Sequence, residues 1–184
     1  MNATPSPRAT ALVTVLGWIS VALGAMGVAS GLLQAAVLPV LQPRQMLAQI
    51  DDAGMPVPPA LAWMLEHLQW LNLASILASA MLLLVAWGLL RRREWGRKGF
   101  IALLVLSALG SLAGAAWFGH FMDGLVGMQQ QMAGDDPVFA RLQLAMRMTL
   151  WAGAIAVAVL HGWLAWLLGT APVRAQFTPG HGPG

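Results

Sequence analysis

Long apolar runs separated by short polar segments dominate the pattern along this chain. Four stretches carry almost no charge, at residues 11–38, 68–90, 99–121 and 148–168. Each is long enough to cross a membrane as a helix, which takes about 20 residues. Backbone groups in lipid must be satisfied within the segment, and none of the runs alternates as a barrel strand does. The pattern therefore predicts an all-α fold, an integral membrane bundle of four transmembrane helices.

The charges between the runs predict an orientation. Five of the ten Lys and Arg residues lie between the second and third runs, at Arg91, Arg92, Arg93, Arg97 and Lys98. Basic residues in short connections stay on the cytoplasmic side and contact lipid headgroups. With four crossings, the segment 1–10 and the tail 169–184 are then cytoplasmic, and the connections 39–67 and 122–147 face outward. The tail is polar and rich in Pro and Gly, so we expect it to be disordered.

Composition narrows the class of protein further. Apolar residues make up 58% of the chain and the mean hydropathy is +0.69, which is implausible for a small soluble core. The isoelectric point near 11.1 reflects scarce charge, because the net charge is only +3, so no nucleic-acid partner is expected. With no cysteine, disulfides and thiolate chemistry are excluded. Cleavage of a signal peptide after Ala29 is the alternative for the first run, which is longer than a signal core.

Small residues predict where helices pack. The first run carries a small-residue seam, in which spacings of three and four alternate: Gly17, Ser20, Gly24, Gly27 and Gly31. Such a stripe lets a neighbouring backbone approach closely, which drives helix association in lipid. Gly110 and Gly114 form a GxxxG pattern in the third run, and we expect packing there as well.

Polar residues inside the runs mark a bundle interior. Asn72, Ser75 and Ser79 follow Gln69 along one face of the second run, and His161 is the only ionisable residue well inside any run. Counting 1.5 Å per helical residue from the outer ends places His161 about 21 Å deep and Ser79 about 18 Å deep. We therefore expect a hydrogen bond between them. A structural role for His161 is favoured over a proton relay, because no carboxylate lies inside a run.

The outer connections hold the sharpest chemical candidates. Glu66, His67, His120 and Asp123 lie at the outer ends of the second and third runs, where they are candidate zinc or copper ligands. Thioethers lie nearby, at Met64, Met122, Met128 and Met132, and a haem held by His67 and His120 is a further alternative. No dense ligand motif and no catalytic motif occurs, so we expect neither a cofactor nor an enzyme. Residues 42–52 predict a short amphipathic helix, and Asp136 a cap of the fourth transmembrane helix.

Two short patches are familiar: Val13 to Ile19 (VTVLGWI) and Arg93 to Arg97 (REWGR). They resemble a loose group of small, uncharacterised bacterial four-helix inner-membrane proteins, in which alanine is usual at the position of Gly96. The resemblance implies a multi-pass protein of the bacterial cytoplasmic membrane and no activity.

The interpretation that fits these observations best is a non-enzymatic interaction or accessory subunit, which associates with the lipid bilayer and with a partner membrane protein or a second copy. The rival interpretations are a metal- or haem-handling protein using His67 and His120, and a small oligomeric transporter or channel built around His161.

Overall fold

In the computed structural model, the residues that can be described are 7–41, 43–52, 57, 59–133 and 137–177. These residues contain helices and no strands. The helices are α1 (Pro7–Leu41), α2 (Pro43–Asp52), α3 (Pro59–Glu66), α4 (Leu68–Leu90), α5 (Glu94–Ala133), α6 (Pro137–Leu168) and α7 (Ala171–Arg174). Four of them, α1, α4, α5 and α6, are long and apolar enough to cross a membrane, which confirms that part of the prediction.

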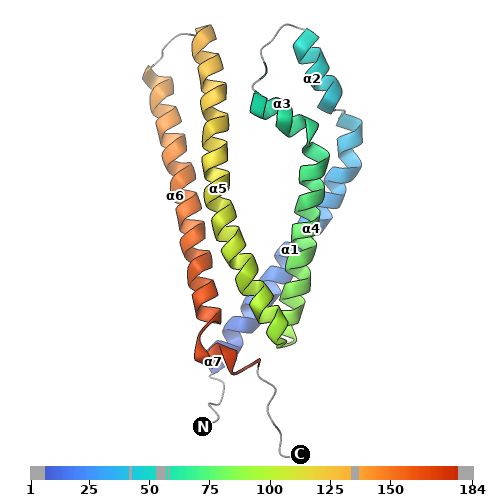
Figure 1. The fold of residues 1–184 in the computed structure, drawn as a ribbon, viewed down its shortest axis with the longest axis vertical. Helices are drawn as coiled ribbons and strands as arrows, with labels where there is room; N and C mark the ends of the chain where they lie inside the picture. The colour runs from blue at the N-terminus through green and yellow to red at the C-terminus, as the bar shows by residue number, and fades with distance from the viewer. Residues whose placement is uncertain (1–6, 42, 53–56, 58, 134–136, 178–184) are drawn as a thin grey trace, which may run out of the picture.

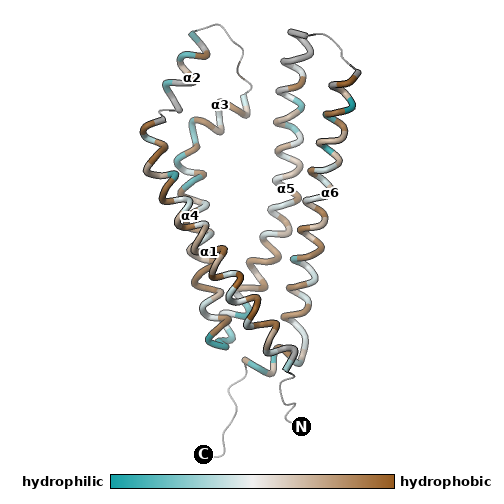
Figure 2. Tube along the Cα trace, turned by 180° about the vertical axis from the view of Figure 1, so that it is seen from behind, coloured by the Kyte–Doolittle hydropathy of each residue, from teal (hydrophilic) through white to brown (hydrophobic). Residues whose placement is uncertain are grey.

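The long helices form two antiparallel hairpins, α1 with α4 and α5 with α6, arranged as a V (Figure 1). The hairpins meet at what we call the closed end, which holds the α4–α5 turn, the start of α1 and α7. They diverge toward the open end, where α2 and α3 lie. Figure 2 shows hydrophobic positions along the middle of the long helices and hydrophilic ones at the α4–α5 turn and in α2. The bundle is therefore splayed.

The small-residue seam of α1 faces α4. A Cβ atom added at Gly17, Gly24, Gly27 or Gly31 would come within 3.0 Å of an α4 side chain. Ser20 is buried in the same face. Among the described residues, the expectation for the third run is wrong, since a Cβ at Gly110 or Gly114 would meet no neighbouring atom within 4 Å. The reason is the splay of the hairpins, which carries this part of α5 away from α4.

The core lies at the closed end. Its buried members come from every element that meets there: Val13, Val85, Leu89, Phe100, Leu104, Leu168, Val173 and Phe177. Val173 and Phe177 belong to the tail expected to be disordered, so that expectation fails as far as Phe177. Val173 lies in α7, and Phe177 comes four residues later in the turn that continues it. This spacing places both side chains on one face, against the core. Residues 178–184 lie outside the described part of the chain.

The helices α5 and α6 run well beyond their apolar stretches. The connection expected over residues 122–147 is helical except at 134–136, which are not described. Helical hydrogen bonds do not depend on hydropathy, and an ion pair between Arg147 Nη1 and Asp123 Oδ1, 3.3 Å apart, joins the two extensions. The short helix expected at 42–52 is present as α2, although Gln42 is outside the described residues, as is Asp136.

Candidate functional site

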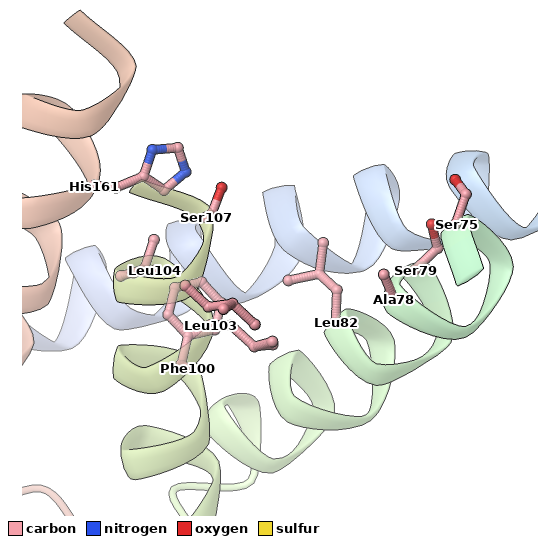
Figure 3. Close-up of a pocket in the computed structure, with 10 residues that line it drawn as sticks. Ser75, Ala78, Ser79, Leu82, Phe100, Leu103, Leu104, Ser107 and His161 are labelled. Atoms are coloured by element: carbon pink, nitrogen blue, oxygen red, sulfur yellow. The ribbon is translucent and has the colours of Figure 1, made fainter. Parts of the chain in front are cut away.

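A groove separates the two hairpins just inside the closed end, and we refer to it as the inter-hairpin groove. Its cavity of about 440 Å³ is bounded by α4, α5 and one residue of α6, and its side chains are mostly apolar (Figure 3). The lining residues are Ser75, Ala78, Ser79, Leu82, Phe100, Leu103, Leu104, Leu106, Ser107 and His161. The volume and lining are typical of small-molecule sites, which combine apolar walls with a few polar groups.

His161 is held in place by its own helix. Its Nδ1 lies 2.7 Å from the Val157 carbonyl oxygen, so Nδ1 carries the proton and donates. Ser111 Oγ of α5 donates to the Ala154 carbonyl oxygen of α6 over 3.4 Å, so these two residues lie opposite each other. Because the helices are antiparallel, seven residues back along α5 and seven residues forward along α6 place Leu104 opposite His161. Ser107 is one helical turn from Leu104. Figure 3 shows His161 and Ser107 on the same side of the cavity.

The hydrogen bond expected between His161 and Ser79 is not formed, although both residues line the cavity. A Cβ at Gly27 would meet Ser79 Oγ, so this hydroxyl points toward α1. Similar depth along two helices did not bring the side chains together, because α4 and α6 belong to different arms of the V. Ser107 was missed by the sequence argument, although it precedes Gly110 by three residues and Gly114 by seven on one helical face.

Toward the open end, the same face of α5 presents Gly110, Gly114 and Trp117. Both glycines are exposed, with nothing packed on them. The Trp117 ring centroid lies 6.5 Å from that of Trp63 in α3, so an edge-on aromatic contact connects the arms beyond the glycines. The groove wall on α5 thus runs between the closed-end core and this contact.

Asn72 belongs to the interface between α1 and α4. Its Nδ2 donates to the Gly31 carbonyl oxygen over 3.1 Å, while its buried Oδ1 has no hydrogen-bond partner. A smaller cavity of about 220 Å³ adjoins it, lined also by Gln69 and Ala35. Pro39 of α1 has no N–H to offer the Ala35 carbonyl, so this part of the interface is short of donors. Ser75, the remaining residue of the polar face, is exposed and lines the inter-hairpin groove.

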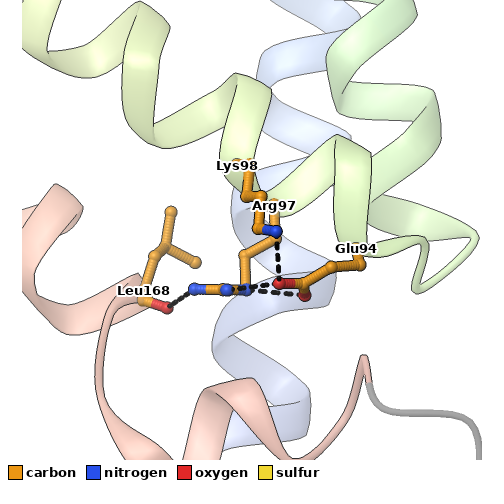
Figure 4. A network of polar contacts seen from close by, with 4 residues as sticks. All are labelled: Glu94, Arg97, Lys98 and Leu168. Carbon is orange, nitrogen blue, oxygen red and sulfur yellow. Dashed lines mark hydrogen bonds and ion pairs between the residues drawn. The ribbon is translucent and has the colours of Figure 1, made fainter.

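Arg97 joins the start of α5 to the end of α6 at the closed end (Figure 4). Its side chain is only 8% exposed, and its Nη2 and Nε bind the two carboxylate oxygens of Glu94 at 2.6 and 3.0 Å. Its Nη1 donates to the carbonyl oxygen of Leu168, the last residue of α6, at 3.2 Å. A cation at a helix C-terminus satisfies an orphan carbonyl and complements the helix dipole.

Arg92 lies two residues after the end of α4, and its side chain reaches back to α1. Its φ of 54° is left-handed, its N–H binds the Leu89 carbonyl, and the next N–H binds the Gly88 carbonyl, which together form a Schellman motif. Glycine is usual at this position. The guanidinium donates to Thr14 Oγ1 at 3.0 Å and also to Gln176 Oε1, and partial burial lowers the pKa of Arg92.

The interpretation of all five basic residues as lipid-headgroup contacts therefore needs correction. Arg92 and Arg97 bind within the chain, whereas Arg91, Arg93 and Lys98 are exposed. Arg91 lies over the Trp87 ring, 4.7 Å from its centroid, and Lys98 Nζ is 3.6 Å from the Glu94 carboxylate. Topology arguments count charges and carry no information about which side chains turn inward.

The candidate metal ligands are not brought together. Across the described residues, no group of three or more His, Asp or Glu side chains is placed to share a metal ion. Asp123 pairs with Arg147, and the His67 ring stacks on Trp63 while its Nδ1 contacts the Trp63 carbonyl oxygen at 2.9 Å. Glu66 lies beside His67 in an open hollow near α2, His120 is exposed, and the side chains of Met128 and Met132 lie outside the described part.

Close approach of α4 and α5 depends on Gly88 and Gly96, which were not among the glycines expected to pack helices. A Cβ at Gly96 would overlap the backbone of Gly88, and a Cβ at Gly88 would come within 2.6 Å of the Trp95 ring. An alanine at position 96 would not fit here without a shift of α4. Comparisons with protein-family models, with curated proteins and with solved structures find no match to this chain.

Proposed function

We propose that this chain is a non-enzymatic accessory subunit of a bacterial cytoplasmic membrane, and that it receives a transmembrane helix of a partner protein against α5. The basic closed end lies in the cytoplasm with both termini, and the open end faces outward. The positive charge of the α4–α5 turn supports this orientation, because Arg91, Arg93 and Lys98 remain exposed there.

The observation that carries the proposal is the unfilled GxxxG pattern of α5. In α1, the same kind of pattern is filled by Ser79 and Ile76 of α4. In α5, a Cβ at Gly110 or Gly114 would meet nothing within 4 Å in the described part of the chain, yet both glycines lie on the groove face one to two helical turns from Trp117. Since close backbone approach is what such patterns supply in lipid, a helix from another chain is the complement that fits.

The rival of metal or haem chemistry is not favoured, because two of its four candidate ligands have other contacts. Asp123 is ion-paired, and His67 is stacked on Trp63 and hydrogen-bonded to the Trp63 carbonyl of α3.

Photocrosslinking tests the proposal in intact membranes. A benzophenone amino acid at Leu106, next to the glycines and 65% exposed, should attach one partner chain, whereas the same group at Val159 of α6, also 65% exposed, serves as the matched control. Native mass spectrometry of the crosslinked product then gives its stoichiometry. Adducts that are identical at both positions, or that persist when Gly110 is replaced by Leu, would refute docking on the glycine face. An added mass equal to that of this chain would show that the docked helix belongs to a second copy and not to a different protein.

A further inference from the structure

The deepest part of the inter-hairpin groove holds polar groups that neither the helix packing nor the proposed partner uses. Leu104, opposite His161, is five residues beyond residue 99, where the apolar run of α5 begins, which corresponds to about 7.5 Å. With a hydrocarbon core about 30 Å thick, the cavity lies inside the hydrocarbon, on the closed-end side of the bilayer centre. Its occupant must therefore come from the bilayer and be largely apolar.

The imidazole restricts that occupant further. The Nδ1 proton is committed to the Val157 carbonyl, so in the neutral tautomer Nε2 is a hydrogen-bond acceptor. Within the described chain, Nε2 has no hydrogen-bond partner. A bare acceptor in hydrocarbon is costly, and such a group facing a cavity points to a ligand that donates.

We propose that the cavity binds a membrane-soluble hydroxyl compound, with its apolar body along Leu82 and Leu103 and its hydroxyl donating to His161 Nε2. The Ser107 hydroxyl lies on the same side and supplies a second polar contact. A phospholipid chain fits less well, because it offers no donor at this depth. Two classes of compound combine an apolar body with a donating hydroxyl in this way: isoprenoid or other long-chain alcohols, and quinols. The inference rests on the membrane placement proposed above and is independent of the partner helix.

The test compares ligands that differ by one hydroxyl. Purified protein in detergent is titrated with phytanol, with phytane, which lacks only the hydroxyl, and with decylubiquinol, and bound ligand is counted by native mass spectrometry. We expect phytanol or decylubiquinol to bind one per chain and about tenfold more tightly than phytane. Binding of one and not the other identifies the source as an isoprenoid alcohol or a quinol.

Two variants locate the binding. His161→Leu removes the acceptor and should bring the affinity for the hydroxyl ligand down to that for phytane. Ala78→Phe fills the cavity from α4 and should abolish binding, whereas Ala156→Phe, at an exposed position of α6 outside the cavity, should leave it unchanged. Failure of the unaltered protein to bind either phytanol or decylubiquinol more tightly than phytane would overturn the proposal. So would hydroxyl-ligand binding that survives both cavity variants in protein that keeps its helical circular dichroism.

The same titration separates this proposal from the proposed function. A protein that crosslinks a partner through Leu106 but binds neither phytanol nor decylubiquinol more tightly than phytane retains its accessory role and lacks the ligand site. A protein that binds a hydroxyl ligand more tightly than phytane but crosslinks no partner through Leu106 has the ligand site alone.

Discussion

At the residue scale, the charged side chains of the α4–α5 turn divide into two groups by what they touch. Arg92 and Arg97 hold the start of α1, the end of α6 and the segment after α7 in place, while Arg91, Arg93 and Lys98 face outward. The carbonyl oxygens of the last four residues of α6 are all satisfied, by Gly169, Thr170 and Arg97. Arg97 is therefore a structural residue whose loss leaves the buried Leu168 carbonyl without a donor and the Glu94 carboxylate with Lys98 as its remaining cation.

Replacing Arg97 by Leu should lower the free energy of unfolding by about 1–2 kcal/mol, because the buried Leu168 carbonyl loses its donor, whereas the 43% exposed Glu94 keeps water and Lys98 as partners. Denaturant titration in detergent, followed by circular dichroism, measures this loss. Arg93→Leu is the matched control at an exposed position and should change stability by less than about 0.5 kcal/mol. Similar losses in the two variants would show that Arg97 contributes through net charge and not through its contacts.

At the scale of elements, glycines have opposite roles depending on what lies against them. Gly96 lies against the Gly88 backbone with no space for a methyl group, whereas Gly110 lies in an open wall. Gly96 and Gly110 both lie in α5, and the spacing of glycines in the sequence does not distinguish the two situations. Only the positions of neighbouring helices do so.

This difference gives a paired prediction. Gly96→Ala should destabilise the protein by about 2 kcal/mol, because the new methyl group forces α4 and α5 apart. Gly110→Ala should stabilise the isolated chain by about 0.5–1 kcal/mol through higher helix propensity, while weakening the crosslink from Leu106. Thermal unfolding of both variants, scored against the unaltered chain, measures the contrast. Equal effects of the two substitutions on unfolding would contradict the packing described at Gly96.

The helices themselves could be predicted, since four runs of apolar residues define α1, α4, α5 and α6 almost to their closed-end limits. The small-residue seam also indicated the correct face of α1. The pattern carries no information on how the two hairpins lie relative to each other. His161 and Ser79 were therefore matched by depth alone, and Gly110 was assigned a neighbour that the splay of the hairpins removes. The order around Val173 and Phe177 was missed because two apolar residues in a polar tail are a weak signal, and their burial depends on tertiary contacts.

At the scale of the whole molecule, the V places all basic side chains of the α4–α5 turn at one end and α2, with its acidic Asp52, at the other. The arms are tied at the closed end by the core and at the level of α3 by Trp63 and Trp117. The orientation proposed above assigns these two ends to opposite sides of the membrane.

Cysteine labelling tests that assignment cleanly, because the chain has no native cysteine. In spheroplasts, a membrane-impermeant maleimide should modify Gln45→Cys in α2 and should modify Arg93→Cys only after the membrane is broken. Both positions are exposed, so accessibility within the protein does not limit the reaction. Labelling of Arg93→Cys alone in intact spheroplasts would reverse the orientation.

The contact between Trp63 and Trp117 also decides by which route the inter-hairpin groove fills. The core closes the groove at the closed end, and the aromatic contact joins the arms toward the open end. A molecule that fills the groove therefore enters from the side, in the plane of the bilayer. Occupancy then follows the mole fraction of an occupant among the surrounding lipids, and the aqueous concentration matters only through partitioning. A cell could therefore set the state of this protein by adjusting membrane composition, with no soluble signal involved.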